Sequence, residues 1–367
     1  MLGVYIHIPF CKKKCNYCDF CSYVRDENTI SLYLDALKRE IFYYTSFFSF
    51  LIAHSSSFFT IYIGGGTPSL LNCHQLKFLF DSIIDNFDIS KVCEITFECN
   101  PESITKEKLK ILKDFGVNRL SIGVQSLNDK ILKFLGRVHT KNDFLKKYEL
   151  ARRLGFENIN IDLIYGIPGQ TLNNWEETLK NVVRLKPEHI SAYCLTIEEG
   201  TKLKKDGIVL DDDKSADMYE FAVSYLVNYR YKHYEISNFA FPKYECKHNI
   251  NYWQNGQYFG FGCSAVSYLN GIRRKNTTDL DLYIETAGEK TAVEEIDIYN
   301  PEKYLSEKIF LGLRMTEGIP LTQEIKNKYG QVIDRFINEG FLKLDSGNIS
   351  LTKSGLFVSN RIFMEFV

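Results

Sequence analysis

Three cysteines lie close together near the start of the chain, at Cys11, Cys15 and Cys18. Their C-x3-C-x2-C spacing offers three thiolates, and cysteine thiolates bind both iron–sulfur clusters and zinc. Three thiolates can hold three irons of a cubane 4Fe–4S cluster and leave the fourth iron open to a small molecule. A structural zinc site instead closes with four ligands, and Cys21 could supply the fourth.

A glycine-rich segment favours the cluster over zinc. Gly64-Gly65-Gly66-Thr67-Pro68 directly follows an apolar, β-branched stretch. Glycines let backbone N–H groups approach an anionic ligand closely, which suits a carboxylate or a phosphate. A structural zinc site would need neither this segment nor the polar side chains that accompany it downstream, which are Glu98, Gln125, Arg137 and Asp162.

Strand-like and helix-like segments alternate along the first part of the chain. The predicted strands cover residues 4–8, 59–63, 94–98, 119–124, 160–164 and 189–196. Apolar residues at helical spacing follow each of them. Successive βα units predict a parallel sheet with helices outside. A full (β/α)8 barrel needs about 250 residues, so the sequence predicts an α/β fold with an incomplete (β/α)6 barrel over residues 1–233.

The candidate site residues follow these predicted strands. Gly65, Glu98, Gln125 and Asp162 each lie at or just beyond the end of a strand, and the three cysteines follow the first strand. Active sites of such barrels lie at the carboxyl ends of the strands. The sequence therefore predicts one site on that rim.

The remaining chain divides into two further regions. Residues 234–300 are predicted to be an aromatic-rich, loop-rich connection. Residues 301–367 predict a small α+β winged-helix-like domain, with a helix over 302–313, a short helix opening at Thr322, a third helix ending at Gly340 and a hairpin after it. Nine Lys and Arg oppose eight Asp and Glu in this domain. DNA binding needs a basic face, so we expect a packing or lid domain and no nucleic-acid partner.

Overall composition indicates a globular protein. Of 367 residues, 45% are hydrophobic and 25% charged, and the net charge is −1. The most apolar stretch, residues 41–53, is shorter than the ~20 residues of a spanning helix and is predicted to be a buried helix end. With no transmembrane segment, no signal peptide before the first strand and ten cysteines, we expect a reducing, cytoplasmic location.

The motifs together resemble a known family. The C-x3-C-x2-C spacing is the signature of radical S-adenosylmethionine (SAM) proteins. Several motifs resemble the branch that contains oxygen-independent coproporphyrinogen III oxidase: Tyr5–Cys11, Gly64–Pro68, Ser121–Ser126 and Asn160–Pro168. Others are similar to HemW-type haem chaperones: Cys18–Phe20, Leu135–Thr140 and His248–Trp253. The resemblance extends to Leu351–Asn360, and so covers essentially the whole chain.

This resemblance implies cofactors and roles. Cys11, Cys15 and Cys18 would bind a 4Fe–4S cluster, and SAM would chelate its open iron. The implied SAM contacts are Tyr5, Tyr17, Gly65, Gly66, Thr67, Glu98, Gln125, Arg137 and Asp162. Ionised carboxylates are acceptors and so suit ribose hydroxyls, whereas an arginine suits the SAM carboxylate through paired donors.

Two departures separate the chain from the oxidases. Cys21 lies three residues after Cys18, whereas the extra cysteine of the oxidases lies two residues after the third ligand. The oxidases also carry an extension before the first strand, which is nearly missing here. Both features disfavour oxidative decarboxylation, and Cys21 is expected to be a free thiol or a spare ligand.

A haem ligand is predicted in the later aromatic region. Haem requires an apolar slot and an axial ligand, often His. The resemblance indicates His248, with Cys246 as a weaker candidate, whereas His7 and His139 lie in SAM-site motifs and are expected to orient their neighbours. Tyr252 and Trp253 could stack on a porphyrin, but packing is favoured because aromatic side chains are mostly core.

The expected function is therefore that of a haem chaperone. It would carry a SAM-liganded 4Fe–4S cluster, receive electrons from a donor, and pass haem to acceptor proteins, among them membrane respiratory proteins. The alternative is an oxygen-independent coproporphyrinogen III oxidase, so the sequence leaves open whether the chain is an enzyme. A winged-helix regulator with a redox-sensing cluster is disfavoured by the charge balance.

Overall fold

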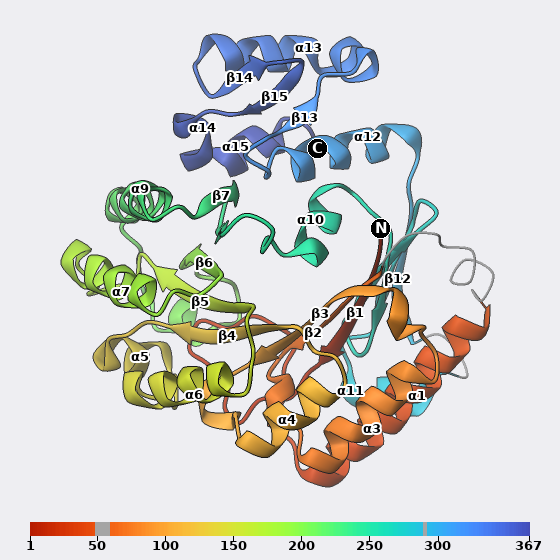
Figure 1. Cartoon of the computed structure of the whole chain (residues 1–367). Helices are drawn as coiled ribbons and strands as arrows, with labels where there is room; N and C mark the ends of the chain where they lie inside the picture. The colour runs from red at the N-terminus through yellow and green to blue at the C-terminus, as the bar shows by residue number, and fades with distance from the viewer. Residues whose placement is uncertain (48–58, 289–291) are drawn as a thin grey trace.

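The computed structural model describes residues 1–47, 59–288 and 292–367 (Figure 1). Its centre is a twelve-stranded sheet in the order β12-β11-β10-β9-β1-β2-β3-β4-β5-β6-β8-β7. Six consecutive parallel strands form its middle: β1 (Leu2–Ile8), β2 (Phe59–Gly65), β3 (Val92–Cys99), β4 (Arg119–Gln125), β5 (Ile159–Tyr165) and β6 (His189–Cys194). Because β1 and β6 do not pair with each other, the barrel stays open, and the predicted incomplete (β/α)6 architecture is confirmed.

Helices connect these strands along the outer side of the sheet (Figure 1). They are α1 (Glu27–Phe47), α3 (Cys73–Ile84), α4 (Lys106–Asp114), α5 (Asp129–Leu135), α6 (Lys141–Arg153) and α7 (Leu172–Arg184), and the short α8 (Lys202–Lys205) and α9 (Asp212–Asn228) follow β6. In α7, Thr171 and Asn174 form a capping box, and Trp175, Leu179 and Val182 are buried. The cap satisfies the first free N–H groups and the apolar stripe faces the sheet, which is why this segment folds as a helix.

The chain after β6 adds strands at both edges of the sheet. The sequence predicted a loop-rich connection for these residues. The added strands are β7 (Lys232–Glu235), β8 (Asn238–Ala240), β9 (Tyr258–Phe261), β10 (Val266–Leu269), β11 (Ile272–Asn276) and β12 (Val293–Ile298), with α10 (Lys247–Trp253) and α11 (Leu280–Thr286) between them. These strands have six residues or fewer and lack regular apolar alternation, so their pattern was missed. β9 pairs in parallel with β1, which brings residues about 250 positions apart into contact.

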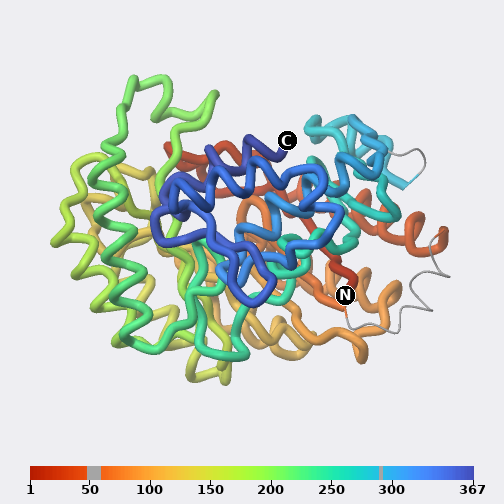
Figure 2. Tube along the Cα trace, turned by 90° about the horizontal axis from the view of Figure 1, so that it is seen from above, coloured from red at the N-terminus to blue at the C-terminus, as the bar shows by residue number. Residues whose placement is uncertain are grey.

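A small C-terminal unit lies above the sheet, over its middle (Figures 1 and 2). It contains α12 (Pro301–Gly312), β13 (Ile319–Pro320), α13 (Gln323–Asn338), β14 (Leu342–Asp345), β15 (Asn348–Leu351), α14 (Lys353–Phe357) and α15 (Ser359–Met364). The predicted hairpin is present as β14 and β15. The prediction of two separate helices between Thr322 and Gly340 was wrong, because α13 passes through Gly330 without a break. A single glycine costs a helix only about 1 kcal/mol.

The apolar stretch at residues 41–53 is only partly described. α1 ends at Phe47, and residues 48–53 lie outside the described part of the chain. Ile41 and Thr45 are buried, whereas Phe42 and Phe47 are exposed, so one face of this helix end is buried as predicted. Among all helices in the described ranges, none combines the length and the apolar character required to cross a bilayer.

Candidate functional site

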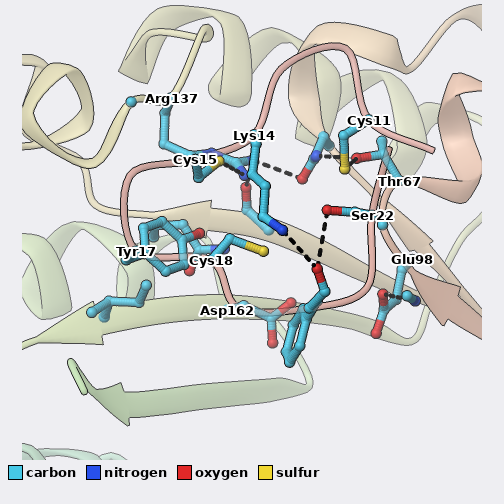
Figure 3. Close-up of a pocket in the computed structure, with 18 of the residues that line it drawn as sticks. Cys11, Lys14, Cys15, Tyr17, Cys18, Ser22, Thr67, Glu98, Arg137 and Asp162 are labelled. Atoms are coloured by element: carbon cyan, nitrogen blue, oxygen red, sulfur yellow. Dashed lines mark hydrogen bonds between the residues drawn. The ribbon is translucent and has the colours of Figure 1, made fainter. Parts of the chain in front are cut away.

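The three predicted cysteine ligands lie in the loop that follows β1, where they line a cavity of about 440 Å³ (Figure 3). The loop is held at its base, because the Cys11 N–H donates to the Tyr23 carbonyl at 3.0 Å and the Tyr23 N–H donates to the Pro9 carbonyl at 2.7 Å. On its far side, the Asn16 N–H donates to the Leu135 carbonyl at 2.9 Å. Backbone hydrogen bonds therefore fix the loop at the rim of the sheet.

Each cysteine thiol is half-buried. Burial raises the pKa of Cys11, and raises that of Cys18 to about 11. These thiols hold their protons in the chain alone and would release them on binding a metal. No three His, Cys, Asp or Glu side chains of the described ranges converge on a single ion. A cubane cluster does not require this convergence, since each thiolate binds a different iron.

Arg137 joins the cysteine loop to the neighbouring strand ends. Its Nη1 donates to Cys15 Sγ at 3.6 Å, and its Nη2 donates to Asn100 Oδ1 and to the Gly123 carbonyl, both at 2.7 Å. The buried Nε has no hydrogen-bond partner among the described residues. A guanidinium beside a cavity with a free donor fits a ligand that carries a carboxylate.

Two buried carboxylates lie on the same rim. Glu98 accepts hydrogen bonds from the Tyr62 hydroxyl at 2.7 Å and from the Gly65 N–H at 3.2 Å. Asp162 accepts from Ser121 Oγ at 2.9 Å. Burial raises the pKa of Glu98 to about 7 and also raises that of Asp162. These hydrogen bonds hold the carboxyl groups at the cavity wall, where they can accept from ligand hydroxyls.

The glycine segment packs against the start of the cysteine loop. A Cβ at Gly66 would lie 2.9 Å from both the backbone N and O of Phe10, and Gly65 has φ +110°. Thr67 Oγ1 lies 3.4 Å from Cys11 Sγ and accepts from Asn100 Nδ2 at 2.9 Å. Glycine is therefore required here by close backbone packing, in addition to the ligand approach that the sequence suggested.

Most of the predicted SAM residues line this one cavity. They are Tyr17, Gly65, Gly66, Thr67, Glu98, Gln125, Arg137 and Asp162. Gln125 ends β4 at a register shift and has φ 68°, a conformation that is uncommon for a non-glycine residue and directs the chain out of the sheet. Tyr5, which was predicted in the same set, is not among the lining residues of this cavity.

Tyr5 lines a second cavity of about 470 Å³. Phe20, Gly65 and Glu98 line both cavities and so form a shared wall. The remaining lining of the second cavity is largely aromatic and apolar: Tyr252, Trp253, Tyr258, Ala265, Val266 and Leu311, together with His7, Cys21, Asn255, Gly256, Ser264 and Arg273. Together with Tyr5, these residues come from β1, the cysteine loop, α10, the β9–β10 region, β11 and α12.

His248 lies behind the second cavity. It is 1% exposed, and its ring nitrogens lie 2.9 Å from Thr60 Oγ1 and 2.9 Å from the Tyr252 hydroxyl. Burial lowers the pKa of His248 to about 3, so the ring is neutral. Both nitrogens are hydrogen-bonded, and the Tyr252 side chain that contacts Nε2 lines the second cavity. The weaker candidate Cys246 is fully buried.

Comparison with known proteins decides the family. Residues 5–182 match the Radical SAM superfamily, and residues 299–358 match the HemN C-terminal domain. The chain is 38% identical over 378 residues to Heme chaperone HemW of Lactococcus lactis subsp. lactis (strain IL1403), covering 100% of this chain and 97% of that protein. The chain belongs to the HemW family of radical SAM proteins. Heme chaperone HemW of Bacillus subtilis (strain 168) is 37% identical over 382 residues, with coverage of 100% and 99%.

A solved structure confirms the fold of this HemW-family chain. Coproporphyrinogen III oxidase (HemN) from Escherichia coli superposes with a TM-score of 0.85 at 24% identity, covering 100% of this chain and 89% of that one. Radical SAM membership implies a 4Fe–4S cluster and SAM as cofactors. The first cavity fits both, because three thiols, an unpartnered arginine donor and two buried carboxylates line it or adjoin it.

Two groups of residues near the cavities of this HemW-family chain were not predicted from the sequence. Asn100, which links Arg137 to Thr67, directly follows β3, so the strand-end argument that found Glu98 could also have found it. Cys263 and Arg273 carry no such signal, because they lie on short strands and turns without a repeating pattern. Their part in the second cavity or beside it is visible only in three dimensions.

Proposed function

We propose that this chain is a haem chaperone that binds a 4Fe–4S cluster and SAM in the first cavity and haem in the second. The observation that carries the proposal is the wall of Phe20, Gly65 and Glu98 shared by a cysteine-lined cavity and an aromatic one. Its support is the similarity, along the full chain, to relatives named haem chaperones.

The first cavity would hold its cofactors through residues that are already positioned. Cys11, Cys15 and Cys18 would bind three irons, and Arg137 would donate to the SAM carboxylate. Glu98 and Asp162 would accept hydrogen bonds from the ribose hydroxyls. When bound, the cluster supplies an electron and an open iron for the amino and carboxylate groups of SAM, so the proposal includes an external electron donor.

The second cavity would receive the porphyrin. Ligand cavities are mostly apolar, with a few polar groups that fix orientation, and Tyr5, Tyr252, Trp253 and Tyr258 provide aromatic faces here. Arg273 is a candidate partner for a haem propionate because its Nε is buried and has no hydrogen-bond partner in the part of the chain that the structure describes, although its Nη1 already donates to Glu307 at 2.6 Å.

His248 stays the proposed axial ligand. A neutral imidazole is the form that binds iron, and burial keeps His248 neutral. Ligation through Nε2 requires the Tyr252 hydroxyl, which lies 2.9 Å from that nitrogen, to move away first. Tyr252 would then act as a gate between the cavity and the ligand.

A haem titration under anaerobic conditions tests this proposal. The wild type should bind haem saturably with a shifted Soret band. His248→Ala should move the Soret maximum and weaken binding, whereas Tyr252→Phe, which frees Nε2 at almost constant volume, should keep the wild-type Soret maximum. Absence of saturable binding in the wild type would refute the haem site. An unchanged spectrum in His248→Ala would place the ligand elsewhere.

The oxidase alternative is tested separately. Cluster-loaded protein with SAM and reductant should leave coproporphyrinogen unconverted in the absence of oxygen, and protoporphyrinogen formation would replace the chaperone proposal. The acceptor would be a haem protein reached from the cytoplasm, such as a membrane respiratory protein. Transfer of bound haem to an apo-acceptor, followed by absorption spectroscopy, tests that step.

A further inference from the structure

We infer that Cys21 and Cys263 form a redox-active thiol pair that is reversibly oxidised to a disulfide at the wall of the second cavity. Their Sγ atoms lie 4.0 Å apart, although the residues are separated by 242 positions in the chain. Neither cysteine belongs to the cluster motif.

The sheet topology explains why these two thiols meet. Cys21 lies in the loop after β1, and Cys263 lies in the turn after β9. β1 and β9 are adjacent parallel strands, with Ile6 paired to Phe261, so both connections leave the sheet at the same edge. The pair is thus a product of the fold and not of sequence proximity.

Hydrogen bonds to β1 and α1 hold both backbones in place. A ring nitrogen of His7 lies 2.9 Å from the Cys21 carbonyl. The Cys263 N–H donates to the Tyr33 hydroxyl at 3.2 Å, and this hydroxyl donates to the His7 carbonyl at 2.5 Å. Gly262 has φ +107°, and a Cβ there would lie 2.5 Å from the Tyr33 hydroxyl, so only glycine permits this close turn. The two sulfurs are therefore held near each other by a network shared between the loops.

The surroundings give the two thiols different roles. A hydrogen bond with Cys263 lowers the pKa of Cys21, and the same interaction raises the pKa of Cys263. Cys21 is half-buried and lines the second cavity, whereas Cys263 is fully buried. A small oxidant in the cavity would therefore meet the thiolate of Cys21 first, and Cys263 would act as the resolving thiol.

The oxidation proceeds by thiol–disulfide exchange with a low-molecular-weight disulfide. The Cys21 thiolate attacks one reagent sulfur, the reagent S–S bond breaks, and the leaving thiolate takes up a proton. Cys263 then loses its proton and attacks Cys21 Sγ, which releases the second reagent thiol. The two protein thiols are oxidised by two electrons, and the reagent is reduced to two thiols. The sulfurs must approach from 4.0 Å to about 2.05 Å.

The bond would join the cysteine loop to the β9–β10 turn. Cys21, Ser264 and Ala265 all line the second cavity. The crosslink would therefore make the structure of this cavity wall depend on the thiol redox state of the cell. The inference concerns the thiols alone and does not depend on haem as the occupant of the cavity. If no disulfide forms, the proposed haem function is unaffected. If haem does not bind, the thiol pair is equally unaffected.

Peptide mapping of the full-length, cluster-loaded protein tests the inference. The protein is treated anaerobically with oxidised glutathione, free thiols are alkylated, and a non-reducing digest is analysed by mass spectrometry. We expect a Cys21–Cys263 crosslinked peptide that disappears after dithiothreitol treatment, with the visible absorption of the cluster retained. The exposed Cys194 is an internal control that should carry glutathione without forming a crosslink.

Two variants identify the order of attack. In Cys263→Ser, the mixed disulfide should be trapped, so that Cys21 carries glutathione in most molecules. In Cys21→Ser, Cys263 should remain unmodified because it is buried. Recovery of Cys21 as an alkylated free thiol in the wild type, or equal glutathione occupancy at Cys21 in wild type and Cys263→Ser, would overturn the inference. The wild-type map does not depend on the folding of any variant.

Discussion

The two cavities share Phe20, Gly65 and Glu98 but are built in different ways. The first lies on the carboxyl ends of successive parallel strands, so each βα unit adds a residue to the same rim. The second combines the cysteine loop with α10, the β9–β10 region, β11 and α12, which come from separate parts of the chain. The first cavity is thus formed by repeated βα units, whereas the second is formed by segments that are distant in the sequence.

This difference separates the chemistry of the two cavities. The first contains thiols, a guanidinium and carboxyl groups, whose hydrogen bonds hold them in fixed positions. The second is mainly aromatic, and its candidate ligand His248 is hydrogen-bonded on both nitrogens. The hydrogen bonds of the first cavity already hold its polar groups in place, whereas the proposed ligation by His248 would require the Tyr252 side chain to move first.

The largest effect should come from Cys15→Ala. This change removes one of three thiolates, so the reconstituted protein should lose the visible absorption of the cluster and most of its bound iron. Cys73→Ala is the matched control, because Cys73 begins α3 and lines neither cavity. A full cluster in Cys15→Ala would break the assignment of the first cavity.

The free energy of unfolding of the protein should depend on pH because of Glu98, which lies in the wall shared by the two cavities. Burial raises the pKa of Glu98 from an ordinary value near 4.5 to about 7. Between these pH values the folded chain keeps a proton that the unfolded chain releases. Glu98 therefore lowers the free energy of unfolding as pH rises through this window, by about 3 kcal/mol in total.

Urea unfolding of wild type and Glu98→Gln, without cluster, measures this effect. The glutamine keeps the shape of the side chain but cannot ionise, so the difference between the two proteins isolates Glu98. The wild type should lose stability relative to the variant from about pH 5 to about pH 7 and then level off. A difference that stays constant with pH would show that Glu98 ionises normally.

Arg137→Ala should weaken SAM binding and leave haem binding unchanged. The guanidinium contacts Cys15 and Asn100 and keeps one donor free. Loss of a hydrogen bond to a charged group costs about 2 kcal/mol, which corresponds to about 30-fold in affinity. Calorimetry on cluster-loaded protein would measure it, with the exposed Arg153→Ala as the control. If haem binding weakened as much as SAM binding, the two cavities would be coupled.

Sequence alone predicted the barrel and most of the first cavity. Glu98 and Asp162 could be found because each belongs to a recognisable strand, and parallel strands place their carboxyl ends on one rim. The spacing of the three cysteines alone indicates a cluster-binding motif. In this part of the chain, local pattern and three-dimensional position coincide.

The second cavity was not predictable by the same argument. β9 and β11 are short, and β11 reads Ile-Arg-Arg-Lys-Asn, without the alternation typical of a half-buried strand. Tyr5 was predicted to contact SAM and lines the second cavity, and a strand position alone does not reveal which side of a shared wall a side chain lines. The Cys21–Cys263 contact likewise depends on the β1–β9 pairing, which no local signal encodes.

Val266→Trp should give the smallest effect and the most direct test of the two-cavity comparison. Val266 begins β10 and lines only the second of the two cavities, so the larger ring should occupy space that haem needs. A steric cost of about 1.4 kcal/mol would weaken haem binding about tenfold, while SAM affinity should stay unchanged. Val227→Trp, at an exposed position on α9, is the matched control. Parallel haem and SAM titrations decide the outcome: if SAM affinity falls together with haem affinity, the two cavities act as one site, and if neither falls, haem binds outside the second cavity.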